Sequence, residues 1–136
     1  MNFKAIAYYL SLFCFPISFL SFINILYSLY FDYFLSIDLY FLTLITSLIF
    51  SSILYFFGRK AEKKLNFFDQ ITLILLTYLI LSIFISIPYY FSNYQLTIIN
   101  SLFESFSGLT GTGFTIFDNI KYLDPTLILW RSSSQW

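Results

Sequence analysis

The chain has 136 residues, of which 59% are hydrophobic and only 10% are charged, and its formal net charge is zero. Soluble domains carry about a quarter of charged residues, so the composition predicts an integral membrane protein that forms one domain or part of one. There is no histidine, and the only cysteine is Cys14, which excludes an internal disulfide, a His/Cys metal site and a Cys–His or Ser–His nucleophile system. Without a basic excess, nucleic acid is not an expected partner.

Two uncharged runs, residues 5–30 and 39–57, are the first predicted membrane spans. Each is long enough to cross a hydrocarbon core of roughly 30 Å. Pro16 is expected to bend the first helix, because proline removes one backbone hydrogen bond. A cleaved signal peptide is the alternative for the first run, but its apolar core is too long and no small-x-small cleavage site follows. In the second run, Tyr40 and Tyr55 lie near the ends, where tyrosines anchor spans at the interface.

The loop after the second span contains four basic residues, Arg59, Lys60, Lys63 and Lys64. The positive-inside rule places such a loop on the cytoplasmic side, and a solvated loop without topological meaning is the alternative. We therefore expect a multi-pass protein of the cell inner membrane with a cytoplasmic N-terminus. The connector that carries Asp32 and Asp38 would then lie outside.

Residues 71–91 form the third predicted span, which runs outward, and a shorter helix is predicted over residues 95–107. In this helix, apolar side chains recur at helical spacing and predict one apolar stripe: Ile99, Leu102, Phe103 and Phe106. The helix would rise only about 20 Å, which is too short to cross the bilayer. A Gly/Thr segment, residues 108–113, follows directly. Non-helical backbone at membrane depth is tolerated where it is buried in protein or lines a water-filled cavity, so this pattern predicts a re-entrant pore helix with a filter loop.

After Gly113 the chain turns polar, which predicts a return to the outer surface. Asp124 and Pro125 are a favourable helix start, because Asp caps free amides and Pro is preferred at the first helical position. We expect residues 126–136 to begin a fourth transmembrane helix. A chain end at mid-membrane would cost several kcal/mol, so we expect that the chain is truncated there.

The predicted fold is therefore all-α and integral to the membrane, with three transmembrane helices, a re-entrant pore helix with its filter loop and the start of a fourth transmembrane helix. Residues 1–58 hold the two leading helices, and residues 59–70 form the cytoplasmic basic loop. Residues 71–136 form a helix–pore loop–helix repeat, truncated in its last helix.

The Gly/Thr segment predicts an ion site built from main-chain oxygens at Thr110, Gly111, Thr112 and Gly113. Potassium sheds water in a narrow pore, and rings of backbone carbonyls replace that water. The glycines accept the backbone angles that such a strand needs, the threonine hydroxyls can anchor it, and the negative end of the preceding helix favours a cation. A flexible Gly/Thr turn is the alternative. A phosphate-binding loop does not fit, because no Lys follows Gly113 and no strand precedes the segment.

Two charged residues are candidates for pore electrostatics, Glu104 and Arg131. Glu104 could face the pore mouth or accept hydrogen bonds from loop amides, and an intramembrane acid is a functional candidate by default. Arg131 could extend to the outer interface or neutralise a carboxylate such as Glu104. The sequence leaves both choices open.

Three stretches carry a resemblance to a known family: LFE at 102–104, SGLTGTG at 107–113 and LWRSSSQW at 129–136. Their order resembles the first pore repeat of the Trk-type potassium uptake proteins, whose opening layout also matches the whole chain. The resemblance implies a potassium-transporting subunit in which four repeats surround one pore and each donates a filter strand. It also implies two kinds of partner beside the lipid bilayer, namely the remaining repeats and a cytoplasmic nucleotide-binding regulatory subunit. The chain departs from the family at Gly111, where Thr is common.

The leading hypothesis is thus the N-terminal part of a potassium transporter that contributes a quarter of the filter and does not conduct alone. A small homotetrameric channel is a second hypothesis. The third is a non-transporting membrane protein, such as an anchoring factor or a decayed gene product. An enzyme is not expected, because no acid–base pair or nucleophile relay can be assembled, and no cofactor is expected beyond potassium as the transported ion.

Overall fold

The computed structural model describes residues 2–33 and 37–135, which form five α-helices and one 3-10 turn and contain no strand. Three helices are long: α1 (Phe3–Tyr30), α2 (Ile37–Gly58) and α3 (Phe67–Tyr90). Each is long and apolar enough to cross a membrane, by length and composition. Their bounds agree with the predicted spans to within a few residues. Pro16 lies inside α1 without interrupting it.

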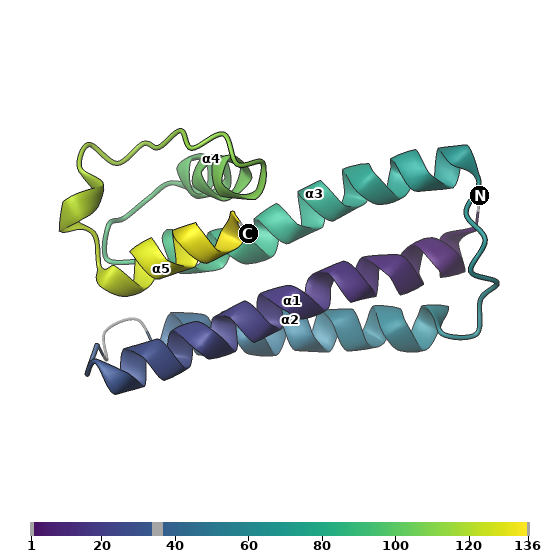
Figure 1. Cartoon of the computed structure of the whole chain (residues 1–136), viewed down its shortest axis with the longest axis horizontal. Helices are drawn as coiled ribbons and strands as arrows, with labels where there is room; N and C mark the ends of the chain where they lie inside the picture. Colours follow the sequence, from purple (N-terminus) through teal and green to yellow (C-terminus); the bar gives the residue numbers. More distant parts are fainter. Residues whose placement is uncertain (1, 34–36, 136) are drawn as a thin grey trace.

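The first two long helices lie side by side and antiparallel (Figure 1). The face that α1 buries is rich in small and polar residues, and so is that of α2, where the Ser18 and Ser47 hydroxyl oxygens are 2.9 Å apart. Large apolar side chains such as Phe19 and Ile53 are exposed instead. Helices that pack in a bilayer show this pattern, because small residues let the backbones approach closely while apolar side chains face lipid.

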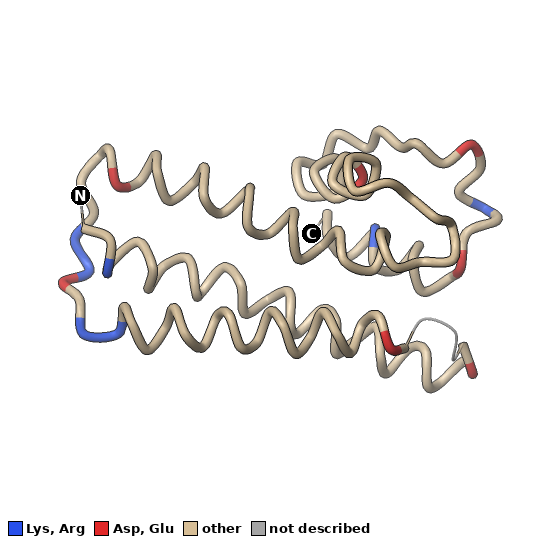
Figure 2. Tube along the Cα trace, turned by 180° about the vertical axis from the view of Figure 1, so that it is seen from behind, with Lys and Arg blue, Asp and Glu red and all other residues tan. Residues whose placement is uncertain are grey.

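Two short helices, α4 (Ile98–Leu109) and α5 (Pro125–Ser134), lie with the turn η2 (Ile120–Tyr122) at one end of the molecule, against the C-terminal part of α3 (Figure 1). Figures 1 and 2 show α4 nearly end-on, so its axis crosses those of the long helices, whereas α5 runs along α3.

The short helix α4 differs from the predicted 95–107 helix in its bounds, which are Ile98–Leu109. It begins after Thr97, whose hydroxyl accepts a hydrogen bond from the Asn100 amide at 3.2 Å. Of the predicted apolar stripe, Ile99 is 77% and Phe103 46% exposed, whereas Leu102 and Phe106 are half-buried. The buried face instead consists of small and polar residues: Ser101, Glu104, Ser105, Ser107 and Gly108. The predicted stripe is therefore the more exposed side of α4, and the spacing of apolar residues alone did not identify the buried side.

Two aromatic residues fix the position of α5. The Trp130 indole Nε1 donates to the Ile85 carbonyl oxygen in α3 at 3.0 Å, and the Tyr40 hydroxyl of α2 donates to Thr126 Oγ1 at 3.0 Å. The Tyr40 and Trp130 rings are 5.6 Å apart. Tyr40 is fully buried, so the prediction that it anchors the span at the interface is wrong: its ring packs inside the protein.

The start of α5 confirms the helix start that was predicted at Asp124 and Pro125. Asp124 is the N-cap and accepts from the Thr126 amide at 2.8 Å, and Pro125 occupies the first turn. This start, together with the aromatic contacts above, sets the direction in which α5 presents Arg131 towards α4.

Candidate functional site

The Gly/Thr segment begins as the C-terminal cap of α4. Gly111 has a φ of 67°, its amide donates to the Gly108 carbonyl at 3.0 Å, and the Thr112 amide donates to the Ser107 carbonyl at 3.1 Å. These two bonds form a Schellman motif, in which a left-handed residue, usually glycine, ends the helix. The backbone therefore favours glycine at position 111, whatever else the loop does.

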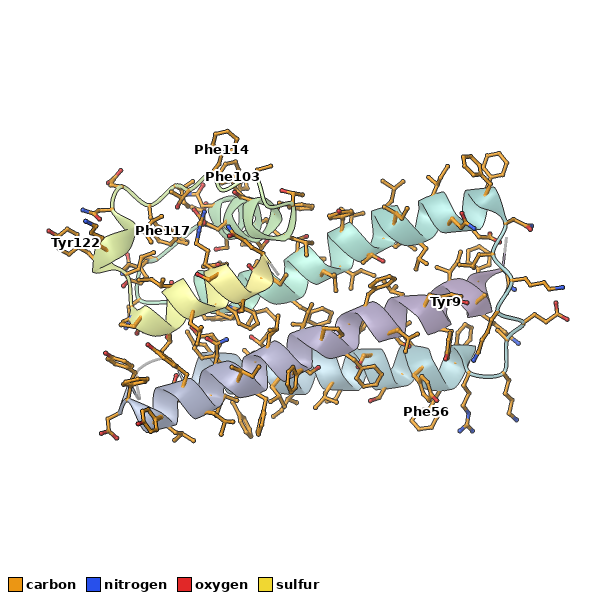
Figure 3. The ribbon with its side chains drawn as sticks, in the orientation of Figure 1. Tyr9, Phe56, Phe103, Phe114, Phe117 and Tyr122 are labelled. Carbon is orange, nitrogen blue, oxygen red and sulfur yellow. The ribbon has the colours of Figure 1, made fainter. Side chains whose placement is uncertain are left out.

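The threonine hydroxyls attach the loop to the end of the helix, as the sequence predicts. Thr110 Oγ1 donates to the Phe106 carbonyl at 2.7 Å, and Thr112 Oγ1 lies 3.2 Å from Ser107 Oγ. Ser107 Oγ in turn donates to the Phe114 carbonyl at 2.5 Å. The loop thus returns over the last turn of α4, and Phe103 and Phe114 both point away from the long helices (Figure 3).

The four predicted ion-binding residues lie together on the surface, and all four are exposed. Within the described residues, the carbonyls of Thr110, Gly111 and Thr112 accept no hydrogen bond. The Gly113 carbonyl, which follows a φ of 76°, accepts one from Arg131 Nη2 at 3.2 Å. Three free carbonyls therefore lie just beyond the negative end of α4.

A buried ion pair lies directly behind this loop. Glu104 is fully buried and Arg131 is 6% exposed, and Nη1 of Arg131 contacts the carboxylate of Glu104. The second terminal nitrogen of the guanidinium, Nη2, also donates to the Phe114 carbonyl at 2.9 Å. Arg131 therefore connects α4, α5 and the end of the loop through one planar group.

The second carboxylate oxygen of Glu104 holds the next stretch of chain. It accepts from Thr115 Oγ1 and from the Ile116 amide, both at 2.6 Å. Of the alternatives left open by the sequence, the structure thus shows Glu104 accepting hydrogen bonds from the loop and Arg131 neutralising Glu104. Sequence reasoning missed Ser107 and Thr115, since a single hydroxyl in a Ser-rich chain gives no signal of its partner.

The electrostatics of the site follow from this pairing. Because the two charges cancel inside the protein, the field at the loop comes mainly from the carbonyl dipoles at the end of α4. The described residues contain no group of three or more His, Cys, Asp or Glu residues that could hold a metal ion. The arrangement can therefore offer a cation backbone oxygens, held in place by a neutral pair.

Of the LWRSSSQW stretch, Trp130 contacts α3 and Arg131 contacts α4. The side chain of Ser132 is exposed and bonds its own helix at the Ile128 carbonyl. The final residue, Trp136, lies outside the described residues.

Comparisons with known proteins give limited but specific information. No family model matches the chain, and no solved structure matches it. The Trk system potassium uptake protein TrkI of Halomonas elongata is 48% identical over 42 residues, which is 31% of this chain and 8% of that relative. The matched part is thus a small fraction of the relative. Together with the three helices that are long and apolar enough to cross a membrane, this partial match loosely supports a Trk-like membrane protein.

Proposed function

We propose that this chain is the N-terminal part of a potassium transporter and that residues 110–113 supply one quarter of its carbonyl-lined selectivity filter. The observation that carries the proposal is the cluster of free carbonyls of Thr110, Gly111 and Thr112, held over the C-terminus of α4. The similarity to a Trk potassium uptake protein favours potassium as the ion.

The chemistry of dehydration determines what one loop can contribute. A potassium ion in a narrow pore needs a full shell of oxygens to replace its water. One loop reaches the ion from one side only, so further pore segments must complete the ring. The chain on its own is therefore expected not to conduct.

The dimensions of α4 support a re-entrant placement. A helix of 12 residues spans about 18 Å, which is well short of a hydrocarbon core of roughly 30 Å. In the proposed orientation, the basic loop and the N-terminus are cytoplasmic and α4 enters from the outer side of the inner membrane. A cytoplasmic nucleotide-binding regulatory subunit belongs to the same proposal.

The buried ion pair separates this proposal from that of a non-transporting protein with an ordinary surface turn. Burying Glu104 and Arg131 removes both charges from water, and such pairs seldom add net stability compared with apolar residues. A surface turn needs no such support. A loop that must keep its carbonyls in one geometry benefits from a rigid group such as the Arg131 guanidinium.

A chimaera tests the proposal. Residues 95–136 would replace the corresponding pore segment of the Halomonas elongata protein, and rubidium uptake would be measured in cells that lack other potassium uptake. We expect uptake by the chimaera and its loss when Gly113→Ala is added, because the left-handed backbone is strained by a side chain. Tyr122→Phe is the matched control, since Tyr122 is 84% exposed and lies outside the loop.

The competing outcomes are distinct. A chimaera that reaches the membrane at the relative's level but takes up no rubidium would contradict the proposal and favour a non-transporting protein. Rubidium flux through the purified chain alone, in proteoliposomes, would instead favour a homotetrameric channel.

A further inference from the structure

The charges of this chain are separated along its length. At one end, residues 4 and 59–69 include five cations and two acids, for a net charge of +3 (Figure 2). The other end holds four acids and one lysine, for a net charge of −3. The Glu104–Arg131 ion pair is neutral and does not change the net charge of either end. A net charge of zero therefore conceals a strongly basic surface at the end where the N-terminus lies.

The basic surface is made of Lys4, Arg59, Lys60, Lys63 and Lys64, all of them exposed. Gly58 brings its two parts together, because a Cβ there would lie 2.5 Å from the Lys4 carbonyl oxygen and 2.5 Å from the Tyr8 amide nitrogen. The absence of a side chain at Gly58 thus allows the first turn of α1 to lie against the end of α2.

Hydrogen bonds from α1 hold the loop that carries the other four cations. Asn2 Nδ2 donates to the Glu62 carbonyl at 3.1 Å, and the Tyr9 hydroxyl donates to the Lys63 carbonyl at 3.1 Å. The Lys63 ammonium also lies 4.6 Å from the centre of the Tyr8 ring. The basic surface is therefore preformed by contacts between segments about 60 residues apart.

The two acids at this end compensate the basic surface only in part. Asp69 is 2% exposed. Its two carboxylate oxygens accept hydrogen bonds from the backbone amides of Asn2 and Asn66, each at 3.2 Å. Glu62 forms no ion pair within the described residues. The cations of the surface thus remain available to an anionic partner.

Exposed phenylalanines place this surface at the edge of the bilayer. Two precede the loop and two follow it: Phe56, Phe57, Phe67 and Phe68, the last of which is 78% exposed. Phe56 points outward (Figure 3). Such side chains belong in acyl chains rather than in water, so the neighbouring cations lie at the level of the lipid headgroups.

We propose that the basic surface binds the phosphate groups of anionic phospholipids. Arg59 offers a planar guanidinium and the lysines offer ammonium groups, both of which donate charge-assisted hydrogen bonds to phosphate oxygens. A zwitterionic lipid carries its own cationic group next to the phosphate, so the basic surface attracts it less strongly. The position between exposed phenylalanines favours a lipid over a soluble anion.

The test uses the purified chain in nanodiscs of phosphatidylcholine with spin-labelled phosphatidylglycerol or phosphatidylcholine. Electron paramagnetic resonance gives the fraction of motionally restricted label, and hence the preference for the anionic lipid. We expect Lys60→Gln/Lys64→Gln to lower this preference by about fivefold or more, and Glu62→Gln to raise it. Lys121→Gln, at the acidic end, is the matched control and is expected to have no effect.

Each other outcome would overturn the proposal. These are an unchanged preference in the double variant, an equal loss in the Lys121→Gln control, or full displacement of the labelled lipid by inorganic phosphate, which would indicate a site for a soluble anion. Circular dichroism of the variants checks that the helices are intact, and both lysines are exposed, so no change is expected there.

Discussion

The two ends of this molecule use charge in opposite ways. Beside the Gly/Thr loop, Glu104 and Arg131 are buried, paired and joined to four partners in the chain. At the basic end, Lys60 and Lys64 are exposed and stand beside cations of the same sign. The comparison teaches that burial, and not the number of charges, decides what a charged residue does here: the buried charges hold the backbone through hydrogen bonds, and the exposed lysines form no ion pair within the described residues.

The largest effect is expected from breaking the buried pair. Arg131→Met leaves the Glu104 carboxylate buried without its cation, and we expect the free energy of unfolding to fall by about 3–5 kcal/mol. Reversible unfolding in mixed detergent micelles measures this change. Lys121→Met is the exposed control.

A paired replacement sharpens the same comparison. Glu104→Leu with Arg131→Met removes both charges, so we expect a smaller loss of stability than in Arg131→Met alone. Equal stability of Arg131→Met and the wild type would show that the pair does not hold the loop.

The next largest loss of stability is expected from replacing Asp69, the buried acid at the basic end. Asp69→Ala leaves the backbone amides of Asn2 and Asn66 without their acceptor, and we expect the free energy of unfolding to fall by about 1–3 kcal/mol. Hydrogen exchange of residues 59–66 should accelerate as well, because α1 then holds the loop less firmly. Asp118→Ala, an exposed acid at the other end, should change neither quantity.

A smaller loss of stability is expected from replacing Gly111 in the Gly/Thr loop. Gly111→Ala has open space around its Cβ but must adopt a left-handed conformation, which costs about 1–2 kcal/mol. Gly111→Asn should cost less, since Asn tolerates that conformation. Thermal unfolding of both variants checks the order, and an Asn variant less stable than the Ala variant would contradict it.

The smallest effect is expected at the basic surface. Lys60→Gln should change the free energy of unfolding by less than about 0.5 kcal/mol, because an exposed side chain leaves no buried group unpaired. A loss as large as that of Asp69→Ala would mean that Lys60 has a structural role.

Local signals in the sequence predicted much of the fold. Composition and length identified the three long helices, and Asp124-Pro125 marked the start of α5. The Gly/Thr segment indicated that α4 ends after Ser107, but the helix continues to Leu109, and the capping role of Gly111 was not predicted. These features depend on neighbours in sequence, and such neighbours can be recognised without the fold.

Contacts between distant residues could not be predicted in the same way. Glu104 and Arg131 are 27 residues apart, and Asn2 and Asp69 are 67 apart. Only the fold decides which of several candidate partners each one meets. Which face of α4 is buried was likewise not predicted: in a membrane protein the apolar face is free to point outward, so the pattern alone does not identify the buried side.

The guanidinium of Arg131 has a mechanical consequence. It belongs to α5 but bonds the carbonyls of both Gly113 and Phe114, so the end of the loop cannot keep its position if α5 slides or tilts. The same planar group also bonds Glu104 of α4, so a displacement of α5 relative to α4 would have to break the hydrogen bonds at the end of the loop or carry the loop with it.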